Sequence, residues 1–174
     1  MTDLTRIKAI TLDVDGVMTD GSLICFDDGN LLRIYNAKDA MGLRMAQMAG
    51  LTVAIITGGR SRSIVARFRT CGAKEEDIYL GCRDKMKDFK HFCEKYNFKP
   101  EEVAYVGDDI PDVSVIKAAG LGVAPADAVA EAKEAADFVS PFPGGKGCIR
   151  DLSERILKAQ GKWVFDVESY EKQY

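Results

Sequence analysis

The sequence predicts an α/β fold in which a parallel β-sheet carries helices on both faces and a β-hairpin projects from it. Five short apolar runs alternate with segments of about ten to fifteen residues that have helical spacing. The first three runs are apolar on both faces of the presumed strand, as expected when helices cover both sides of a sheet. This alternation is typical of βαβ units.

The predicted elements follow in order along the chain. Strands are expected within the runs IKAITLD (7–13), LTVAIIT (51–57), EEVAYVGD (101–108), GLGVAP (120–125) and ADFVS (136–140). The spacing of apolar residues predicts helices over about 38–49, 61–71, 84–96, 111–119, 127–136 and 149–160. Pro111 fits the first turn of its helix, where a backbone N–H has no partner to lose.

One segment interrupts the alternation of strands and helices. SLICFDDGNLLRIYN (22–36) contains two strand patterns around Asp28-Gly29-Asn30, which predicts a β-hairpin over about 22–35. Further on, SPFPGGKGCIR (140–150) contains two prolines and three glycines and predicts a mobile loop before the last helix. We expect one domain over 1–162 and a polar C-terminal tail over 163–174.

Composition and charge narrow the class of partner. The 174 residues carry a net charge of -3 with both signs spread along the chain, so no basic stripe indicates nucleic acid or a membrane surface. No apolar run approaches the roughly 20 residues of a membrane span, and the start of the chain lacks the apolar stretch of a signal peptide, which predicts a cytoplasmic protein. Five scattered cysteines without a C-x-x-C pair favour reduced thiols. We therefore expect a small-molecule partner.

Acidic residues follow two of the predicted strands. Ligands bind beyond the carboxyl ends of the strands in open α/β sheets, so side chains at these positions are the candidate site. Asp13 and Asp15 share side-chain parity after the first run, and Gly16 lets the backbone turn away beneath them. Two close carboxylates repel each other unless a cation intervenes. Together with Asp108 they form an oxygen-rich set that suits Mg²⁺ better than zinc.

Two further residues are suited to a phosphate group. Thr57 offers a hydroxyl beside backbone N–H groups at a helix start, and Lys85 adds a compact positive charge. Each motif also has an ordinary explanation, because D-x-D and T-G-G occur in turns and a lysine at a helix start is usually solvated. GDDIPD (107–112) fits a capped helix start. All four motifs following strands in this order favours a catalytic site.

These motifs resemble those of the haloacid dehalogenase superfamily of aspartate-nucleophile phosphatases, in LDVDGVMTDG (12–21), IITGGR (55–60), Lys85 and VGDDIPD (106–112). The resemblance implies a Rossmann-like fold, Mg²⁺ dependence and an aspartyl-phosphate intermediate. It implies that Asp13 is the nucleophile and Asp15 the general acid and base. It also implies that Thr57 and Lys85 hold the phosphate, and that Asp13, Asp108 and the backbone carbonyl of Asp15 hold the metal. Supporting roles are implied for Asp109 and Asp112.

Within this superfamily the chain is similar to the 3-deoxy-D-manno-octulosonate 8-phosphate phosphatases, which lack a cap domain and form tetramers. The similarity covers most of the chain, including YNAKDAMGL (35–43), GGKGCIRDL (144–152) and AQGKW (159–163). A hairpin fills the first interval between motifs, and one helix and one short strand fill the second, which leaves little room for a cap. The resemblance implies a homotetramer with hairpins at its core, a tail that reaches a neighbouring active site, and a phosphorylated sugar acid as substrate.

The sequence identifies the substrate-binding residues less completely than the catalytic and metal-binding ones. The segment YNAKDAMGL would lie near the substrate, which makes Asn36, Lys38 and Asp39 candidates, although an ordinary helix N-terminus also explains them. Many relatives read T-G-R where this chain has Thr57-Gly58-Gly59 and then Arg60. Relatives that act on 2-keto-3-deoxynononate 9-phosphate, the nine-carbon alternative, can carry a glutamate in this region, so the resemblance implies that the basic Arg60 favours the eight-carbon acid. Other anion-contact candidates are Lys146 and Arg150.

Two different classes of protein compete with this interpretation. A phosphoacceptor signalling domain uses similar residues, but its acceptor aspartate would follow a middle strand, and here that strand ends in Thr57. A regulatory or assembly domain of the same fold would have lost activity, and retention of all four motifs argues against it. Asp20, which begins the hairpin, is expected to be a turn or support residue.

Overall fold

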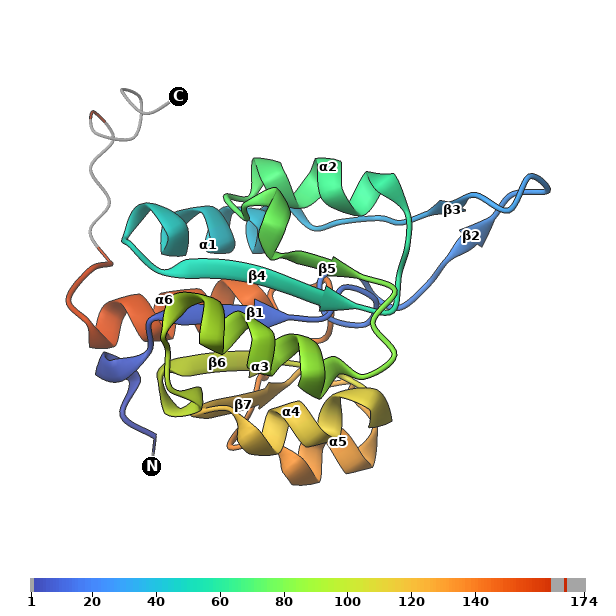
Figure 1. The fold of residues 1–174 in the computed structure, drawn as a ribbon. Helices are drawn as coiled ribbons and strands as arrows, with labels where there is room; N and C mark the ends of the chain where they lie inside the picture. The colour runs from blue at the N-terminus through green and yellow to red at the C-terminus, as the bar shows by residue number, and fades with distance from the viewer. Residues whose placement is uncertain (1, 164–167, 169–174) are drawn as a thin grey trace.

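The computed structural model describes residues 2–163 and residue 168, and it has the predicted α/β architecture (Figure 1). Six parallel strands form one sheet in the spatial order β5-β4-β1-β6-β7-β8. They are β1 (Ala9–Leu12), β4 (Thr52–Thr57), β5 (Ile78–Leu80), β6 (Val103–Val106), β7 (Leu121–Ala124) and β8 (Phe138–Val139). The central strand β1 pairs with β4 on one side and β6 on the other. Because all neighbours are parallel, their carboxyl ends meet at one edge.

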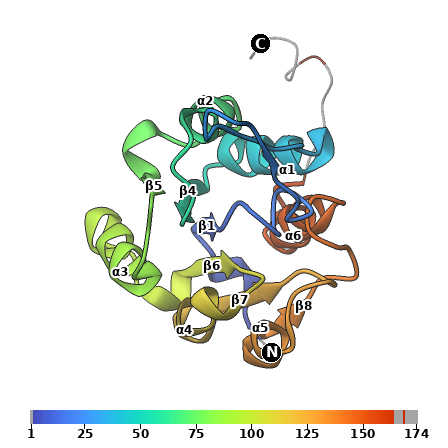
Figure 2. The ribbon, with the colours of Figure 1, turned by 90° about the vertical axis from the view of Figure 1, so that its right-hand side faces the viewer.

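Helices cover both faces of this sheet, as Figure 2 shows end-on. One face carries α1 (Ala37–Met48), α2 (Arg62–Thr70) and α6 (Cys148–Ala159), and the other carries α3 (Lys85–Tyr96), α4 (Val113–Ala118) and α5 (Ala130–Ala135). Successive side chains of β1 alternate between the two cores, with Ile10 and Leu12 in the first and Ala9 in the second. The short 3-10 helices are η1 (Leu4–Arg6), η2 (Glu75–Asp77), η3 (Pro100–Glu102) and η4 (Ile110–Asp112).

The predicted hairpin projects from the sheet as a separate two-stranded ribbon (Figure 1). Its strands are β2 (Ile24–Cys25) and β3 (Leu31–Leu32), and the turn lies at Asp28-Gly29-Asn30 as expected. Between the hairpin and α1, and between Arg60 and Lys85, the described residues leave no room for a further domain; the second interval holds α2, η2 and β5. The expectation of a capless fold is therefore met.

The glycine-rich segment 140–150, which the sequence predicts to be a mobile loop, packs in part against the loop that follows β1. Gly144 and Gly145 are buried, and the Gly145 N–H donates to the Val17 carbonyl at 2.8 Å. A Cβ on Gly144 would lie only 1.9 Å from the Gly16 carbonyl oxygen, so glycine is needed for this close approach. These contacts hold the glycine-rich segment against the loop that follows β1, and the composition of the segment alone could not predict them.

Two further expectations concern the C-terminal tail and membrane-spanning segments. Of the predicted tail 163–174, only Trp163 and Glu168 are described, so its predicted reach into a neighbouring site lies outside the described residues. Among the helices that are described, none combines the length and apolar character needed to cross a bilayer.

Candidate functional site

A cavity of about 360 Å³ lies where the carboxyl ends of the strands meet. It gathers residues that follow β1, β4, β5 and β6, namely Asp13, Asp15, Gly16, Gly21, Thr57, Gly58, Gly59, Cys82, Lys85, Asp108, Asp109, Pro111 and Asp112. A larger cavity, of about 600 Å³, lies beside η1 and α6, but none of the predicted site residues lines it. The chemistry of the lining, rather than cavity size, therefore identifies the candidate site.

A buried lysine links two carboxylates at the floor of this cavity. Lys85 is the first residue of α3, and its Nζ donates to Asp13 Oδ2 and to Asp112 Oδ1, each at 2.7 Å. The lysine is only 6% exposed, so it is not the solvated helix-start residue that its sequence position also allows. Burial by itself would lower the pKa of Lys85, but the two carboxylates outweigh it and raise this pKa.

Asp112 supports the site from beneath. Its side chain is fully buried, and besides Lys85 it accepts hydrogen bonds from the Tyr105 hydroxyl and from the Asp108 backbone N–H. The Tyr105 hydroxyl is itself buried beside Asp112 and Asp13, and its pKa lies well above the ordinary value, chiefly because of burial. Asp112 therefore fixes both the lysine and the start of the Asp108 loop.

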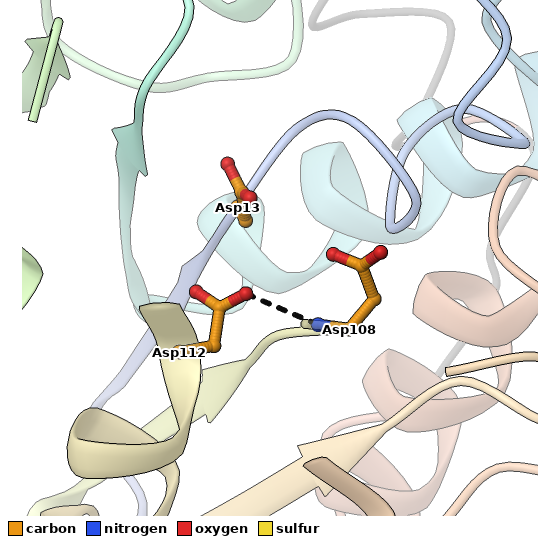
Figure 3. A group of neighbouring side chains, drawn as sticks. All are labelled: Asp13, Asp108 and Asp112. Carbon is orange, nitrogen blue, oxygen red and sulfur yellow. Dashed lines mark hydrogen bonds between the residues drawn. The ribbon is translucent and has the colours of Figure 1, made fainter. Parts of the chain in front are cut away.

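Three carboxylates gather closely enough to share a cation. Oxygen atoms of Asp13, Asp108 and Asp112 all lie within 4.8 Å of one another (Figure 3). Burial, and then the charges of Asp13 and Asp112, raise the pKa of Asp108 to about 7. A Cβ on Gly16 would lie 1.9 Å from Asp108 Oδ2, so this glycine makes room for the carboxylate. Such crowding of hard oxygen donors, with excess negative charge, fits Mg²⁺.

Arg33, which the sequence analysis did not single out, is the partner of Asp15. Its Nε donates to Asp15 Oδ1 at 2.7 Å and its Nη2 to Asp15 Oδ2 at 2.9 Å. The only signal in the sequence is a basic residue between Leu32 and Ile34, which reads as an ordinary hairpin position. The contact joins the hairpin to the loop that follows β1, so the alternation of strands and helices along the sequence could not predict it.

The loop after β4 contributes Thr57, Gly58 and Gly59 to the cavity. Thr57 is 1% exposed, and its Oγ1 accepts the Gly59 N–H at 3.1 Å. Arg60 is exposed and does not line the cavity; its side chain lies against Gly81, where a Cβ would be 2.9 Å from Arg60 Nε. The structure thus brings the predicted threonine and glycines, but not the arginine, to the cavity wall.

The predicted substrate residues of the segment after the hairpin also lie outside the cavity lining. Asn36 is the N-cap of α1 and accepts the Lys38 N–H at 2.8 Å, while Lys38 is exposed. Asp39 is fully buried and accepts the N–H groups of Gly147 at 3.0 Å and of Arg150 at 2.9 Å. Gly147 has no side chain with which to cap α6, so Asp39 satisfies these donors from α1.

The remaining charged candidates have partners on the surface. Asp20 Oδ1 accepts the Ser22 N–H at 3.0 Å, which fits the expected turn role. Lys146 Nζ lies 3.8 Å from Asp20 Oδ2, and Arg150 Nε donates to Glu154 Oε1 at 2.6 Å. None of the three lines the cavity.

Known proteins resemble this chain in sequence and in structure. The family model of haloacid dehalogenase-like hydrolases matches residues 77–147. The 3-deoxy-D-manno-octulosonate 8-phosphate phosphatase of Salmonella typhi is 39% identical over 162 residues, which cover 93% of this chain and 85% of that protein. The corresponding protein of Escherichia coli K12 is 39% identical over 157 residues, covering 90% and 82%.

Two solved structures of proteins with the same name superimpose closely. The Yersinia pestis protein has a TM-score of 0.88 at 36% identity, covering 92% of this chain and 85% of that one. The Moraxella catarrhalis protein, in complex with a magnesium ion, a phosphate ion and KDO, has a TM-score of 0.89 at 28% identity, covering 98% and 95%.

Proposed function

Because this chain belongs to the 3-deoxy-D-manno-octulosonate 8-phosphate phosphatase family of haloacid dehalogenase-like hydrolases, we propose that it hydrolyses this ester to the free sugar acid and phosphate. One observation carries the proposal: Asp13 lies at the end of β1 against buried Lys85, with Asp108 beside it. This arrangement combines a nucleophile, a fixed cation and an acidic metal set in one cavity. The relatives' shared name favours the eight-carbon acid over the nine-carbon alternative.

In the proposed reaction Asp13 attacks phosphorus in line, and the bond between phosphorus and the sugar oxygen breaks. Asp15 donates a proton to that departing oxygen, which leaves an aspartyl phosphate on Asp13. Asp15 then takes a proton from a water molecule as the water attacks phosphorus. The bond between phosphorus and Asp13 breaks, phosphate leaves, and both carboxyl groups return to their starting states. General acid and base assistance of this kind is worth about a hundredfold to ten-thousandfold.

Charge has to be neutralised before a carboxylate can approach a dianionic phosphate ester. Lys85, the Thr57 hydroxyl and the Gly58 N–H group would hold the phosphate oxygens. The Gly59 N–H would have to leave its bond to Thr57 Oγ1 to join them. Asp13, Asp108 and the backbone carbonyl of Asp15 would hold Mg²⁺, and when bound this ion supplies positive charge against the phosphate. Asp112 would keep Lys85 aimed at the reacting group.

Outside the cavity wall, Arg60 remains our candidate for the sugar carboxylate. It follows the phosphate-holding loop directly, and it is exposed. Its present position against Gly81 would have to change for such a contact. Asn36 and Lys38 are weaker candidates of the same kind, and Asp39 is better explained by its bonds to the start of α6.

We also propose that the chain assembles as a homotetramer through its hairpins. A two-stranded ribbon is marginal without a partner surface, and this one exposes Ile24 at 52%, Phe26 at 51%, Leu32 at 44% and Ile34 at 73%. Light scattering of the wild type and of Ile34→Lys tests this: the variant should dissociate, and an unchanged mass for both at the monomer value would contradict the proposal.

A cytoplasmic location fits the five cysteines, all of which are free. Cell fractionation followed by immunoblotting tests this location, and recovery in a membrane or exported fraction would contradict it.

A panel of phosphorylated sugar acids and hexose phosphates, assayed with Mg²⁺ and with EDTA, tests the proposed reaction. We expect the eight-carbon keto acid phosphate to be preferred and EDTA to abolish turnover. If common hexose phosphates serve equally well, the substrate assignment is wrong. Asp13→Asn should abolish phosphate release, and robust activity of this variant would refute the nucleophile assignment. A protein that becomes labelled but barely turns over would instead be a phosphoacceptor domain.

A further inference from the structure

We propose that Arg33 is a positioning residue that fixes the carboxylate of Asp15 in the orientation required for proton transfer. The inference rests on the proposed function, in which Asp15 moves the protons. Arg33 follows β3, so it comes from the hairpin rather than from the edge of the main sheet. None of the motifs at the strand ends contains it.

The geometry of the contact between Arg33 and Asp15 restrains the Asp15 carboxylate. Two parallel N–H donors of the guanidinium meet the two carboxylate oxygens at 2.7 and 2.9 Å, which fixes the plane of the carboxylate as well as its position. The Arg33 side chain is 2% exposed, whereas that of Asp15 is 28% exposed. Most surface ion pairs restrain little, but this arginine is enclosed.

The strand pattern of the hairpin directs Arg33 inward. Its neighbours Leu32 and Ile34 are 44% and 73% exposed. Successive side chains of an extended segment point to opposite sides, so the residue between them faces the protein. The hairpin therefore presents apolar side chains on one side and delivers a single cation to Asp15 on the other.

Residues that follow β4 provide a hydrogen-bond acceptor and space for the Arg33 guanidinium. Ser61 occupies the N-cap position of α2 but makes no capping bond; its Oγ accepts from Arg33 Nη1 at 3.1 Å. A Cβ on Gly59 would lie 3.2 Å from Arg33 Nη2 and 2.7 Å from Ile64 Cδ1. A side chain at position 59 would therefore crowd the arginine, and the glycine keeps its place open.

The restraint leaves Asp15 able to exchange a proton. A carboxylate has about four acceptor positions, and the two N–H bonds from Arg33 use one on each oxygen. Asp15 also lines the cavity that contains Asp13. It can thus donate a proton to the departing alkoxide and later accept one from water, while Arg33 keeps its own proton throughout both steps.

Leaving-group dependence tests the role of Arg33, because kcat/KM reports the steps up to departure of the alcohol. An alkoxide needs a proton as it leaves, whereas p-nitrophenolate leaves without one. For Arg33→Met we expect kcat/KM to fall about 10- to 100-fold with 3-deoxy-D-manno-octulosonate 8-phosphate and to stay within about threefold with p-nitrophenyl phosphate. Arg33→Lys should be intermediate, because lysine keeps the charge but cannot make the paired contact.

Two controls separate positioning from other roles. Asp15→Asn combined with Arg33→Met should lose no more activity than Asp15→Asn alone, since Arg33 acts through Asp15. Arg67→Met is a matched control, because Arg67 lies on α2 over the ring of Tyr35, at 5.7 Å, and should leave both substrates unaffected.

Equal losses on both substrates, or an additive double variant, would overturn the proposal and make Arg33 a structural or substrate-binding residue. If Arg33→Met fails to fold, Ser61→Ala removes a hydrogen bond that holds the guanidinium, at a residue outside the cavity lining, and should give the same substrate pattern at smaller amplitude; absence of that pattern would also overturn it. Failure of the wild type to hydrolyse 3-deoxy-D-manno-octulosonate 8-phosphate would refute the proposed function itself.

Discussion

Replacing Asp108 by Asn should stabilise the metal-free protein at neutral and alkaline pH while removing its response to Mg²⁺. Burial and the neighbouring charges of Asp13 and Asp112 raise the pKa of Asp108 from an ordinary 3.8 to about 7 in the folded protein. The folded state therefore binds this proton more tightly than the unfolded state. Its stabilising contribution is present at low pH and is lost as the pH rises through about 7.

The magnitude follows from the two pKa values. Each pKa unit corresponds to about 1.4 kcal/mol, so the ceiling is about 4 kcal/mol. Asp108 is partly exposed, and solvent screening reduces the expected effect to about 1–2 kcal/mol. The gain in unfolding free energy of Asp108→Asn over wild type should grow from near zero at about pH 4 to this value at about pH 8.

Urea unfolding with EDTA, and again with excess MgCl₂, measures both effects. Mg²⁺ should stabilise the wild type clearly more than the variant, since we propose that the ion binds the folded state through this carboxylate. Glu131→Gln is the matched control: it changes charge by the same amount at an exposed position of α5 outside the cavity lining and should show no such gain. A gain that is equal at both pH values, or equal stabilisation of wild type and Asp108→Asn by Mg²⁺, would refute the reasoning.

Three further substitutions probe the surroundings of the site. Gly16→Ala forces a Cβ to 1.9 Å from Asp108 Oδ2 at a φ of +80°, so Mg²⁺ titration of activity should show affinity weakened by roughly 100-fold; unchanged affinity would contradict the fit. Lys85→Met leaves two buried carboxylates uncompensated and should cost about 3 kcal/mol in urea unfolding as well as nearly all turnover; wild-type stability would count against it. Asp39→Ala leaves two backbone N–H groups of the α6 start without their acceptor and should cost about 2 kcal/mol with KM unchanged; a raised KM at full stability would make Asp39 a substrate contact.

The spacing of hydrophobic residues and the residue types at turns predicted the helices, strands and hairpin of this fold well. The helix expected over 84–96 is observed at Lys85–Tyr96, and that expected over 149–160 at Cys148–Ala159. These patterns are local, so tertiary packing did not need to be known. The helix expected over 111–119 begins instead as η4 (Ile110–Asp112) and continues as α4 (Val113–Ala118), because a proline and two aspartates shape its first turn.

The expected gathering of acids at the sheet edge is met, because parallel strands place their carboxyl ends together. Asp13, Lys85 and Asp108 line one cavity although they follow β1, β5 and β6 in the chain. The segment after the hairpin shows the opposite case. Asp39 reads as a pocket residue in a motif, but only the packing of α1 against α6 reveals that it serves backbone donors.

The sequence by itself determined which elements form and which chemical groups stand at the strand ends, since both depend on residue type and short-range spacing. Tertiary structure alone decided what those groups touch. Arg33 reaches Asp15 across 18 residues of chain, and Lys85 reaches Asp13 across 72. Such contacts depend on which distant side chains the folded chain brings together. Burial then sets their strength, because a charge that is removed from water interacts with its partner in place of the solvent.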